Sequence, residues 1–497
     1  MHQTKRQSKQ HENYKVYPRS LYGGSFLGKL QRCNKDSDGS ATPGTDVVLK
    51  NQSVTPAFVK KMPGFDNLEV FSMVGSDDKL EQSPNYVFGG SADGAGLFKN
   101  TDGTFAYLVN HEDNFAVSRI TFDKTLKPIK GEYVMNSDGG LWRLCSATLA
   151  TPEEHGFGPL FLTSGESGEE SRTHALELGA STVNAGASRE LAALGRQSAE
   201  NAVPLAKTAY PGKTAIIIGD DDSGANGGQV LLYWANVGDL QNGELFVMRR
   251  KDLNQRETDM KVGTKHEVEF VKIENQKTLT GRQQNILMDQ TLKAIKFGRV
   301  EDLDYRKDGI GREIYFNVTG QNNTGENADN SRAKYGRVYK LNLNAGAPTA
   351  GTLEVILDGD DRTGKARMFQ NPDNILVTKN YLYTQEDPNS YGDETHDAYI
   401  YQYNLATGET KIALELDHRR TFADRDSYNV SGVSRFGSWE YGAMLDVSDQ
   451  LGIPDAFMIC IQPHTWRGDK YKGVDGGKLR PDENQASQIV IVKGLPR

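Results

Sequence analysis

The stretch "YLYTQEDP" at residues 381–388 contains a short strand that runs directly into two adjacent carboxylates. Tyr381 and Tyr383 are large residues with a strong preference for β-structure. Glu386 and Asp387 follow them, and like charges this close together repel each other unless water or a cation compensates them. A short strand followed by acidic residues recurs along the chain, and the predicted fold and function both depend on this recurrence.

Five further apolar runs end in acidic or polar residues in the same way. They are "FAYLVNHED" (105–113), "LFLTSGES" (160–167), "AIIIGDDD" (215–222), "IYFNVTGQ" (314–321) and "FMICIQPH" (457–464). Glu112, Glu166 and Asp220 follow one another at equal intervals, and a period of this size with strands and turns is typical of propeller blades. The pattern predicts an all-β fold, a six-bladed β-propeller. An irregular pair of β-sandwiches is the second interpretation.

Two segments differ from this pattern. Residues 1–65 are polar and irregular, and they are interpreted as an N-terminal arm or wrapping segment that precedes a propeller domain at 66–497. In "SRELAALGRQSAENAVPLAK" (188–207), Leu191 and Leu194 belong to an apolar set at helical spacing, and Ser188 could cap a helix. We therefore predict an inserted helical segment near 188–207.

Composition excludes some classes of protein. The net charge of -8 argues against nucleic acid as the main partner. No apolar run is long enough to span a membrane, and the chain opens without the apolar core of a signal peptide. The 3 cysteines form an odd number, so at least one thiol is unpaired in a monomer and disulfides do not organise the fold. A monomer that acts on a small molecule is expected.

The acidic strand ends are expected to converge. In a propeller, the strands that line the channel end together at one mouth, although they are distant in sequence. Glu112, Glu166, Asp220 and Glu386 would then face one another, and several carboxylates in one small space cannot all stay ionised without cations. Calcium is the natural counter-ion because it accepts many flexible oxygen ligands.

Eight short stretches, in conserved order along most of the chain, carry a resemblance to a known family. They are "NHED" (110–113), "LCSATLATP" (144–152), "FLTSGES" (161–167), "IIIGDDDSG" (216–224), "FGRVEDLDY" (297–305), "NPDNILV" (371–377), "SWEYGA" (438–443) and "IQPH" (461–464). Together they resemble segments of the PhoX-type alkaline phosphatases. That resemblance implies a six-bladed propeller that hydrolyses phosphate monoesters outside the cytoplasm with iron and calcium ions.

The resemblance also implies roles for individual residues. Cys145 would supply a thiolate to iron, and Arg299 would bind the substrate phosphate. Carboxylate ligands to iron and calcium would be Glu166, Glu301, Glu386 and Glu440, with a further oxygen from Asp302. Secondary metal candidates are Glu112, Asp220, Asp387 and His464. These roles make chemical sense, because thiolates suit iron better than calcium and the planar fork of arginine fits phosphate oxygens.

The chain departs from the family pattern at three places. Gly165 stands where the family has the first of two glutamates, and Val300 replaces a proline. In "TPEEHGFGP" (151–159), Glu153, Glu154 and His155 stand where the family has an aromatic residue. Two other functions therefore stay open. One is a secreted, calcium-stabilised propeller that binds a partner without catalysis, and the other is a calcium-dependent, lactonase-like hydrolase. Bound iron would distinguish the phosphatase from these two alternatives, because it is expected only for the phosphatase.

Overall fold

The computed structural model describes residues 45–430 and 434–497, so most of the predicted arm, residues 1–44, lies outside the described residues. The next residues join sheets formed by the C-terminal part of the chain. Strand β1 (Val59–Lys61) pairs antiparallel with β22 (Thr410–Leu416). Strand β2 (Glu69–Gly75) pairs with β25 (Gln488–Lys493). The predicted arm therefore contributes one strand, β1, to a sheet, whereas β2 belongs to the predicted propeller domain.

The described strands form five sheets. The first contains β3 (Ala92–Lys99), β4 (Phe105–His111), β5 (Ala116–Phe122) and β6 (Pro128–Met135). The second contains β7 (Leu144–Ala150), β8 (Leu160–Gly165) and β9 (Thr173–Glu177). The third contains, in spatial order, β10 (Ala199–Pro204), β11 (Lys213–Asp220), β12 (Gln229–Asn236), β13 (Glu244–Arg250), β14 (Lys265–Ile273), β18 (Ala347–Asp358), β17 (Arg337–Asn344), β16 (Glu313–Val318) and β15 (Val300–Tyr305). The fourth contains β19 (Pro372–Val377), β20 (Tyr381–Glu386), β21 (Tyr399–Asn404), β22 and β1, and the fifth contains β23 (Glu440–Asp446), β24 (Ala456–Gln462), β25 and β2.

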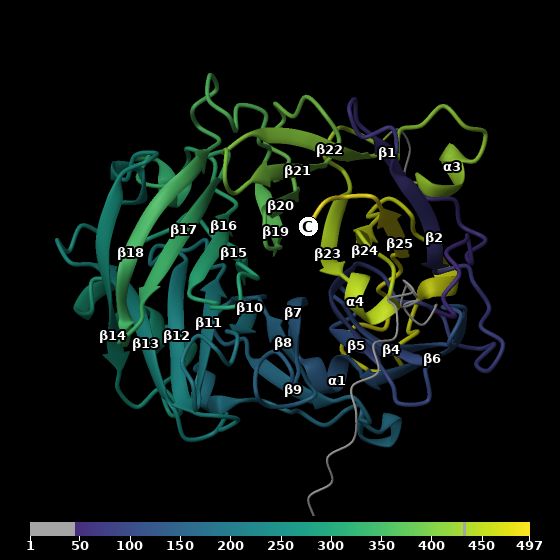
Figure 1. Cartoon of the computed structure of the whole chain (residues 1–497), viewed down its shortest axis with the longest axis horizontal. Helices are drawn as coiled ribbons and strands as arrows, with labels where there is room; N and C mark the ends of the chain where they lie inside the picture. Colours follow the sequence, from purple (N-terminus) through teal and green to yellow (C-terminus); the bar gives the residue numbers. More distant parts are fainter. Residues whose placement is uncertain (1–44, 431–433) are drawn as a thin grey trace, which may run out of the picture. The chain divides into compact units, whose positions relative to one another are not determined.

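The sheets of residues 45–497 surround a common centre (Figure 1). Six terminal strands contact one another in a closed circuit, in the order β3, β7, β10, β15, β19, β23 and back to β3. Such a circuit of innermost strands is the arrangement of a β-propeller. The predictions of an all-β fold and of a propeller-like arrangement are confirmed.

The prediction of six separate blades is corrected. Four sheets are separate, whereas β10 to β18 form one nine-stranded sheet because β14 pairs with β18 from Lys265↔Glu354 to Glu269↔Ala350. A strand at the edge of a sheet has unpaired backbone N–H and C=O groups. Since β14 and β18 are 9 and 12 residues long, they extend far enough to satisfy these groups against each other.

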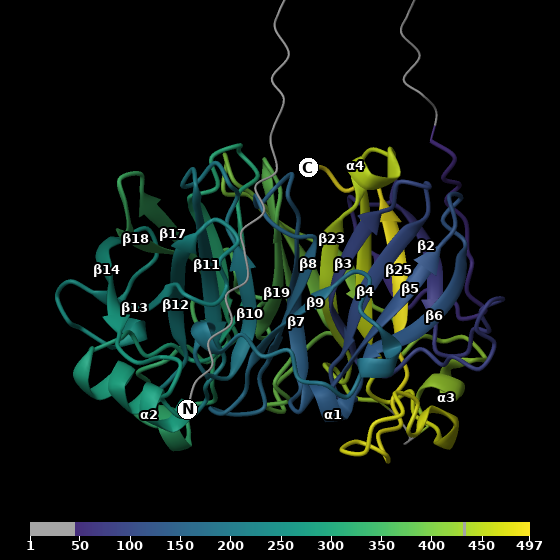
Figure 2. The same cartoon turned by 90° about the horizontal axis from the view of Figure 1, so that it is seen from below.

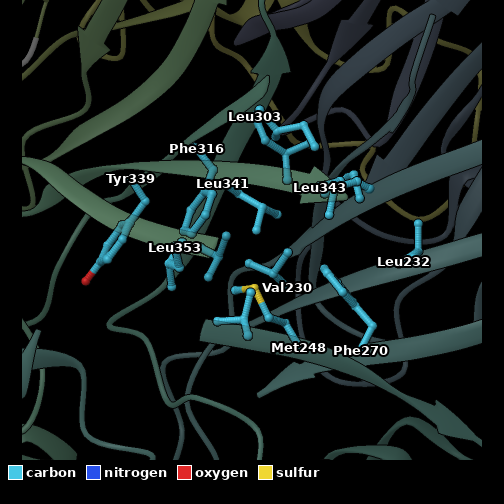
Figure 3. Packing of buried hydrophobic residues seen from close by; sticks show 14 of the residues in the cluster. Val230, Leu232, Met248, Phe270, Leu303, Phe316, Tyr339, Leu341, Leu343 and Leu353 are labelled. Atoms are coloured by element: carbon cyan, nitrogen blue, oxygen red, sulfur yellow. The ribbon is translucent and has the colours of Figure 1, made fainter. Parts of the chain in front are cut away.

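A large apolar core holds the nine-stranded sheet together (Figure 3). Val230 and Leu232, two residues apart on β12, point to the same face and pack in one cluster with Met248, Leu341 and Leu353. All five side chains are almost fully buried. Because burial of each such side chain contributes about 1.5–3 kcal/mol, this core fixes the strands that carry part of the site described below.

The predicted helix at 188–207 is wrong. The segment contains a short 3₁₀ turn, η2 (Ala192–Leu194), and then strand β10 (Ala199–Pro204), which pairs with β11. Every residue of β10 is buried, because the strand belongs to the innermost circuit. Burial on all sides and backbone pairing override the local helical pattern.

The described helices are short and lie at the ends of the strands. They are α1 (Ser137–Gly140), α2 (Gly281–Ile286), α3 (Arg425–Tyr428) and α4 (Ser448–Leu451), with single turns η1 (Thr182–Asn184), η3 (Glu257–Asp259), η4 (Leu287–Thr291), η5 (Gly325–Asn327) and η6 (Asp469–Tyr471). Figure 2 shows α1, α2 and α3 at one end of the sheets and α4 at the other. In the described part of the chain, no helix has the length and apolar character needed to cross a membrane.

Candidate functional site

Each of the six innermost strands carries an acid or a thiol at its first or second residue. These residues are Asp93 (β3), Cys145 (β7), Glu200 (β10), Glu301 (β15), Asp373 (β19) and Glu440 (β23). The pairing register of all six strands shifts at or just after this residue, for example between Leu144 and Ala147 in β7. Bulges of this kind re-aim a side chain out of the regular alternation. The backbone is therefore adapted, blade by blade, to point these groups at the centre.

The ligand atoms of these residues and of three neighbours form one continuous cluster. They fall into four groups, each with all its ligand atoms within 4.8 Å of one another: Asp93, Cys145 and Glu200; Glu112, Cys145 and Glu166; Glu200, Glu301 and Asp373; and Asp373, Asp387 and Glu440. The groups share Cys145, Glu200 and Asp373, which link them together. We call these nine residues the central cluster.

Most of the predicted site residues lie in or beside the central cluster. The structure brings together Cys145, Glu166, Glu301 and Glu440, together with the secondary candidates Glu112 and Asp387. His464 lies at its edge, with Nε2 3.2 Å from Glu440 Oε1 and Nδ1 2.7 Å from Gln485 Oε1.

Glu386 does not reach the central cluster. Its carboxylate accepts hydrogen bonds from the backbone N–H groups of Gln370 and Tyr399, at 2.7 and 2.9 Å, and from the Tyr401 hydroxyl at 2.9 Å. Its other contact is His396 Nε2, at 2.9 Å. Successive residues of a strand point to opposite faces, so Asp387 reaches the centre and Glu386 holds its own sheet together.

Asp302 also points away from the central cluster. Its carboxylate accepts hydrogen bonds from Asn201 Nδ2 at 2.7 Å and from the backbone N–H of Leu303 and Ile375 at 2.8 and 3.2 Å. Burial raises its pKa to about 7. The residue lines a separate cavity of about 220 Å³. Asp220 belongs to none of the four groups either, and its carboxylate lies elsewhere.

The strands predicted to line the channel are not the innermost ones. Each is the next strand outward in its sheet. The apolar runs that end near Glu112, Glu166, Asp220 and Glu386 are β4, β8, β11 and β20, the second strands of their blades. Asp93, Glu200 and Asp373 start the innermost strands and were missed. A repeated signal exists in "ADGA" (92–95), "LCSA" (144–147), "AENA" (199–202), "VEDL" (300–303) and "PDNI" (372–375), with an acid or thiol second and an apolar residue fourth.

Two arginines border the central cluster. Arg299 Nε and Nη2 lie 2.7 and 3.1 Å from the two carboxylate oxygens of Asp221, Nη2 lies 3.1 Å from Glu301 Oε1, and Nη1 donates to Asn389 Oδ1 at 2.8 Å. Arg299 has a φ of 71°, a strained region for a residue with a side chain, and such strain is concentrated at functional sites.

Arg143, which sequence reasoning missed, is 41% exposed at the same cluster. It contacts Glu112 Oε1 at 3.2 Å, Asp113 Oδ1 at 3.0 Å and Glu166 Oε1 at 3.8 Å. Its partial exposure leaves part of the guanidinium free to meet an anion from solvent.

Negative charge in the central cluster exceeds what these arginines neutralise. Burial, followed by repulsion from neighbouring carboxylates, raises the pKa values of Asp93, Glu166, Glu200 and Asp373 well above their ordinary range. Burial and the carboxylates of Glu112 and Glu166 likewise raise the pKa of the Cys145 thiol. A cation at the centre would reverse both effects, because it favours the charged form of each ligand.

The donor set suits two kinds of metal ion. Eight carboxylates offer the hard oxygen ligands that calcium prefers, and one thiol offers a soft ligand that iron accepts. The backbone carbonyl of Cys145 accepts a hydrogen bond from Asn110, whose side-chain oxygen is held by Thr163 Oγ1 at 3.0 Å. The strand segment that carries the thiol is therefore fixed in place.

A groove opens beside Arg299. It has a volume of about 340 Å³, and Arg299 is its only charged lining residue. The other lining residues are uncharged: Ser223, Gly320, Gln321, Asn322, Thr324, Asn389 and Tyr391. A molecule bound to Arg299 would place its remaining atoms against hydroxyl and amide groups.

Comparison with known proteins gives a match in structure, and no match to a family model or to a curated protein. The structure of Pseudomonas fluorescens PhoX in complex with vanadate, described as a transition state analogue, has a TM-score of 0.58 over 90% of this chain and 98% of that chain, at 14% identity. A GH43 β-1,3-galactosidase with galactodeoxynojirimycin covers 84% of this chain and 94% of its own at 10% identity, with a TM-score of 0.33. The chain therefore has a PhoX-like fold.

Proposed function

We propose that this chain is a metal-dependent phosphoesterase that hydrolyses phosphate monoesters at the central cluster. The observation that carries the proposal is the convergence of eight carboxylates and one thiol, of which one residue comes from each innermost strand and three follow second strands, bordered by Arg143 and Arg299. The PhoX-like fold supports the choice of phosphate chemistry. The acids and the thiol would hold iron and calcium, and these ions would stabilise the charge that develops on the transferred phosphoryl group.

The residues of the chain would do three things in the reaction. The Arg299 fork, held in one orientation by Asp221, would bind phosphate oxygens. Arg143, on the side of Glu112 and Glu166, would offset negative charge when the substrate enters. The groove beside Arg299 would hold the group esterified to the phosphate and position it for cleavage.

We also propose that the nine-stranded sheet represents two blades joined at their outer edges. β10 and β15, its two end strands, both belong to the innermost circuit and both carry a glutamate of the central cluster. In this interpretation six blades each supply one residue to the centre, and the β14–β18 pairing is a local addition.

A pair of cysteine variants tests the function. Cys145→Ala should lose iron, any visible colour due to iron–thiolate charge transfer, and phosphomonoesterase activity. Cys460→Ala is the matched control, because Cys460 is also buried but contacts Tyr107 Oη at 3.2 Å and lies in an apolar core. Metal content by elemental analysis and hydrolysis of a chromogenic phosphomonoester are the measurements.

Each outcome selects one function. Iron and activity in the wild type and in Cys460→Ala, both lost in Cys145→Ala, support the phosphoesterase. Calcium without iron, and hydrolysis of a lactone in place of the phosphomonoester, would support the lactonase-like alternative. Metal binding without either activity would leave a calcium-stabilised binding protein.

A further inference from the structure

A second group of buried oxygens lies outside the central cluster. Asp220, at the end of β11, is fully buried, and neither of its carboxylate oxygens has a hydrogen-bond partner. Gln229, at the start of β12, and Asn285, in α2, are each 1% exposed, and their side-chain oxygens Oε1 and Oδ1 are also without partners. Unpartnered buried polar atoms are costly and infrequent, so three residues of this kind in one region need an explanation.

Strand pairing and helix packing bring these residues together. Asp220 lies directly opposite Gln229 in the β11–β12 ladder, so both side chains project from one face. On that face Ile218 and Leu231 pack in one apolar cluster with Met288, in the turn that continues α2. Asn285, three residues before Met288, donates from Nδ2 to Asp222 Oδ2 at 3.2 Å. Asp222 is only two residues from Asp220 in the sequence, so this hydrogen bond connects Asn285 of α2 to the end of β11.

The group is separate from the central cluster. Asp221, between the two aspartates, extends its side chain to Arg299. Neighbouring residues along an extended chain point to opposite sides, so Asp220 is directed away from Arg299 and toward α2. Burial, followed by repulsion from Asp222, Asp221 and Glu169, raises the pKa of Asp220 well above its ordinary range.

The chemistry of the unpartnered atoms defines the ligand. The unpartnered atoms of Asp220, Gln229 and Asn285 are all oxygen acceptors. A single cation can be a ligand partner for all of them together. Carboxylate oxygens combined with neutral amide oxygens are the ligand type of calcium, which needs no thiol or imidazole. We propose that Asp220, Asp222, Gln229 and Asn285 form a calcium site, distinct from the central cluster, which fastens α2 to the end of the β11–β12 strand pair.

Calcium binding and thermal unfolding of the whole protein test this proposal, with calcium chloride as the probe and EGTA to remove it. Asp220→Asn should bind about one calcium ion per chain fewer than the wild type. In calcium its Tm should fall below that of the wild type because a bound ion is lost. In EGTA its Tm should equal or exceed that of the wild type, because an uncompensated buried charge is removed.

Two comparisons make the result specific. Asp397→Asn removes another buried carboxylate, one whose oxygens are already bonded to His418 and Arg419, so its Tm should change by the same amount in calcium and in EGTA. Cys145→Ala should keep the calcium ion that Asp220→Asn loses, whatever happens at the central cluster. This separates the present site from the proposed phosphoesterase.

The proposal is overturned if Asp220→Asn binds as much calcium as the wild type and shifts Tm equally in both conditions. Should that variant fail to fold, Asn285→Ala decides, because Asn285 lies on a short helix outside the sheet. Its calcium affinity at this site should fall roughly tenfold or more. An unchanged number of ions with unchanged affinity would also overturn the proposal.

Discussion

Replacement of Arg299 by lysine should lower kcat/KM for a phosphomonoester while the bound metal stays unchanged. The guanidinium offers five N–H donors, and in the structure three of them donate hydrogen bonds, two to Asp221 and one to Asn389, while Nη2 also forms an ion pair with Glu301. The second N–H of Nη1 can meet a phosphate oxygen, and exchange of the Asn389 contact would give another. Lysine keeps the charge but cannot hold Asp221 and a phosphate oxygen together.

The size of the effect follows from the number of hydrogen bonds lost. One hydrogen bond to a charged group contributes about 1.5–3 kcal/mol. If it forms to the transition state, its loss lowers kcat/KM roughly 10- to 100-fold. Alanine would do more, because it also leaves the buried carboxylates of Asp221 and Glu301 unpaired, which costs about 3–5 kcal/mol in the free energy of unfolding of the metal-free protein.

Steady-state kinetics and elemental analysis of the same preparation test this reasoning. Arg119→Lys is the control, since Arg119 pairs with Glu132 at 2.8 Å in the β5–β6 ladder, outside the site. Wild-type kcat/KM in Arg299→Lys would refute the assignment of Arg299 to the substrate. Loss of metal in proportion to activity would show that the residue acts on the ions and not on the phosphate.

Two other substitutions probe the supporting structure. At Gly94, a Cβ would lie 2.3 Å from Ala147 N, so Gly94→Ala should push β3 away from β7, lower the free energy of unfolding by about 1–3 kcal/mol and reduce the metal content. Gly179→Ala, with open space around it, should do neither, and equal behaviour of the two variants would contradict the argument. Burial lowers the pKa of His155 to about 4, below its ordinary 6.5. The unfolded chain therefore takes up this proton first, and as pH falls from about 6.5 to 4 the protein should lose about 3 kcal/mol of stability through this residue. His155→Gln should flatten that part of the stability curve measured by denaturant unfolding, and parallel curves would disprove it.

The sequence predicts the class of fold better than its details. Runs such as "AIIIGDDD" correctly indicate strands, and Cys145, Glu166, Glu301 and Glu440, which were expected at the site, all lie in the central cluster. The pairing of β14 with β18 could not be predicted, because it depends on how far two outer strands extend in space. The segment at 188–207 misled because its apolar spacing is compatible with a helix, while the pairing partner that makes it a strand is a separate segment, β11.

The errors within the site have a local cause. Glu386 and Asp387 are chemically almost equivalent in the sequence, and strand geometry alone decides which of them faces the centre. Asp93, Glu200 and Asp373 follow small or apolar residues at the start of strands, where no acidic run draws attention to them. The bulges that turn them inward are a property of strand pairing, which periodicity within one strand does not reveal.

β2 pairs with β25 and β1 pairs with β22, so two sheets can be completed only after the C-terminal part of the chain has been synthesised. During translation the first strands emerge long before their partners, and they must wait while the intervening sheets form. Until the segment that carries Glu440 has left the ribosome, one side of the central cluster is missing. Loading of the proposed metal ions would therefore follow synthesis of this segment, and a nascent chain arrested before residue 440 should fold several sheets yet hold no complete set of cluster residues.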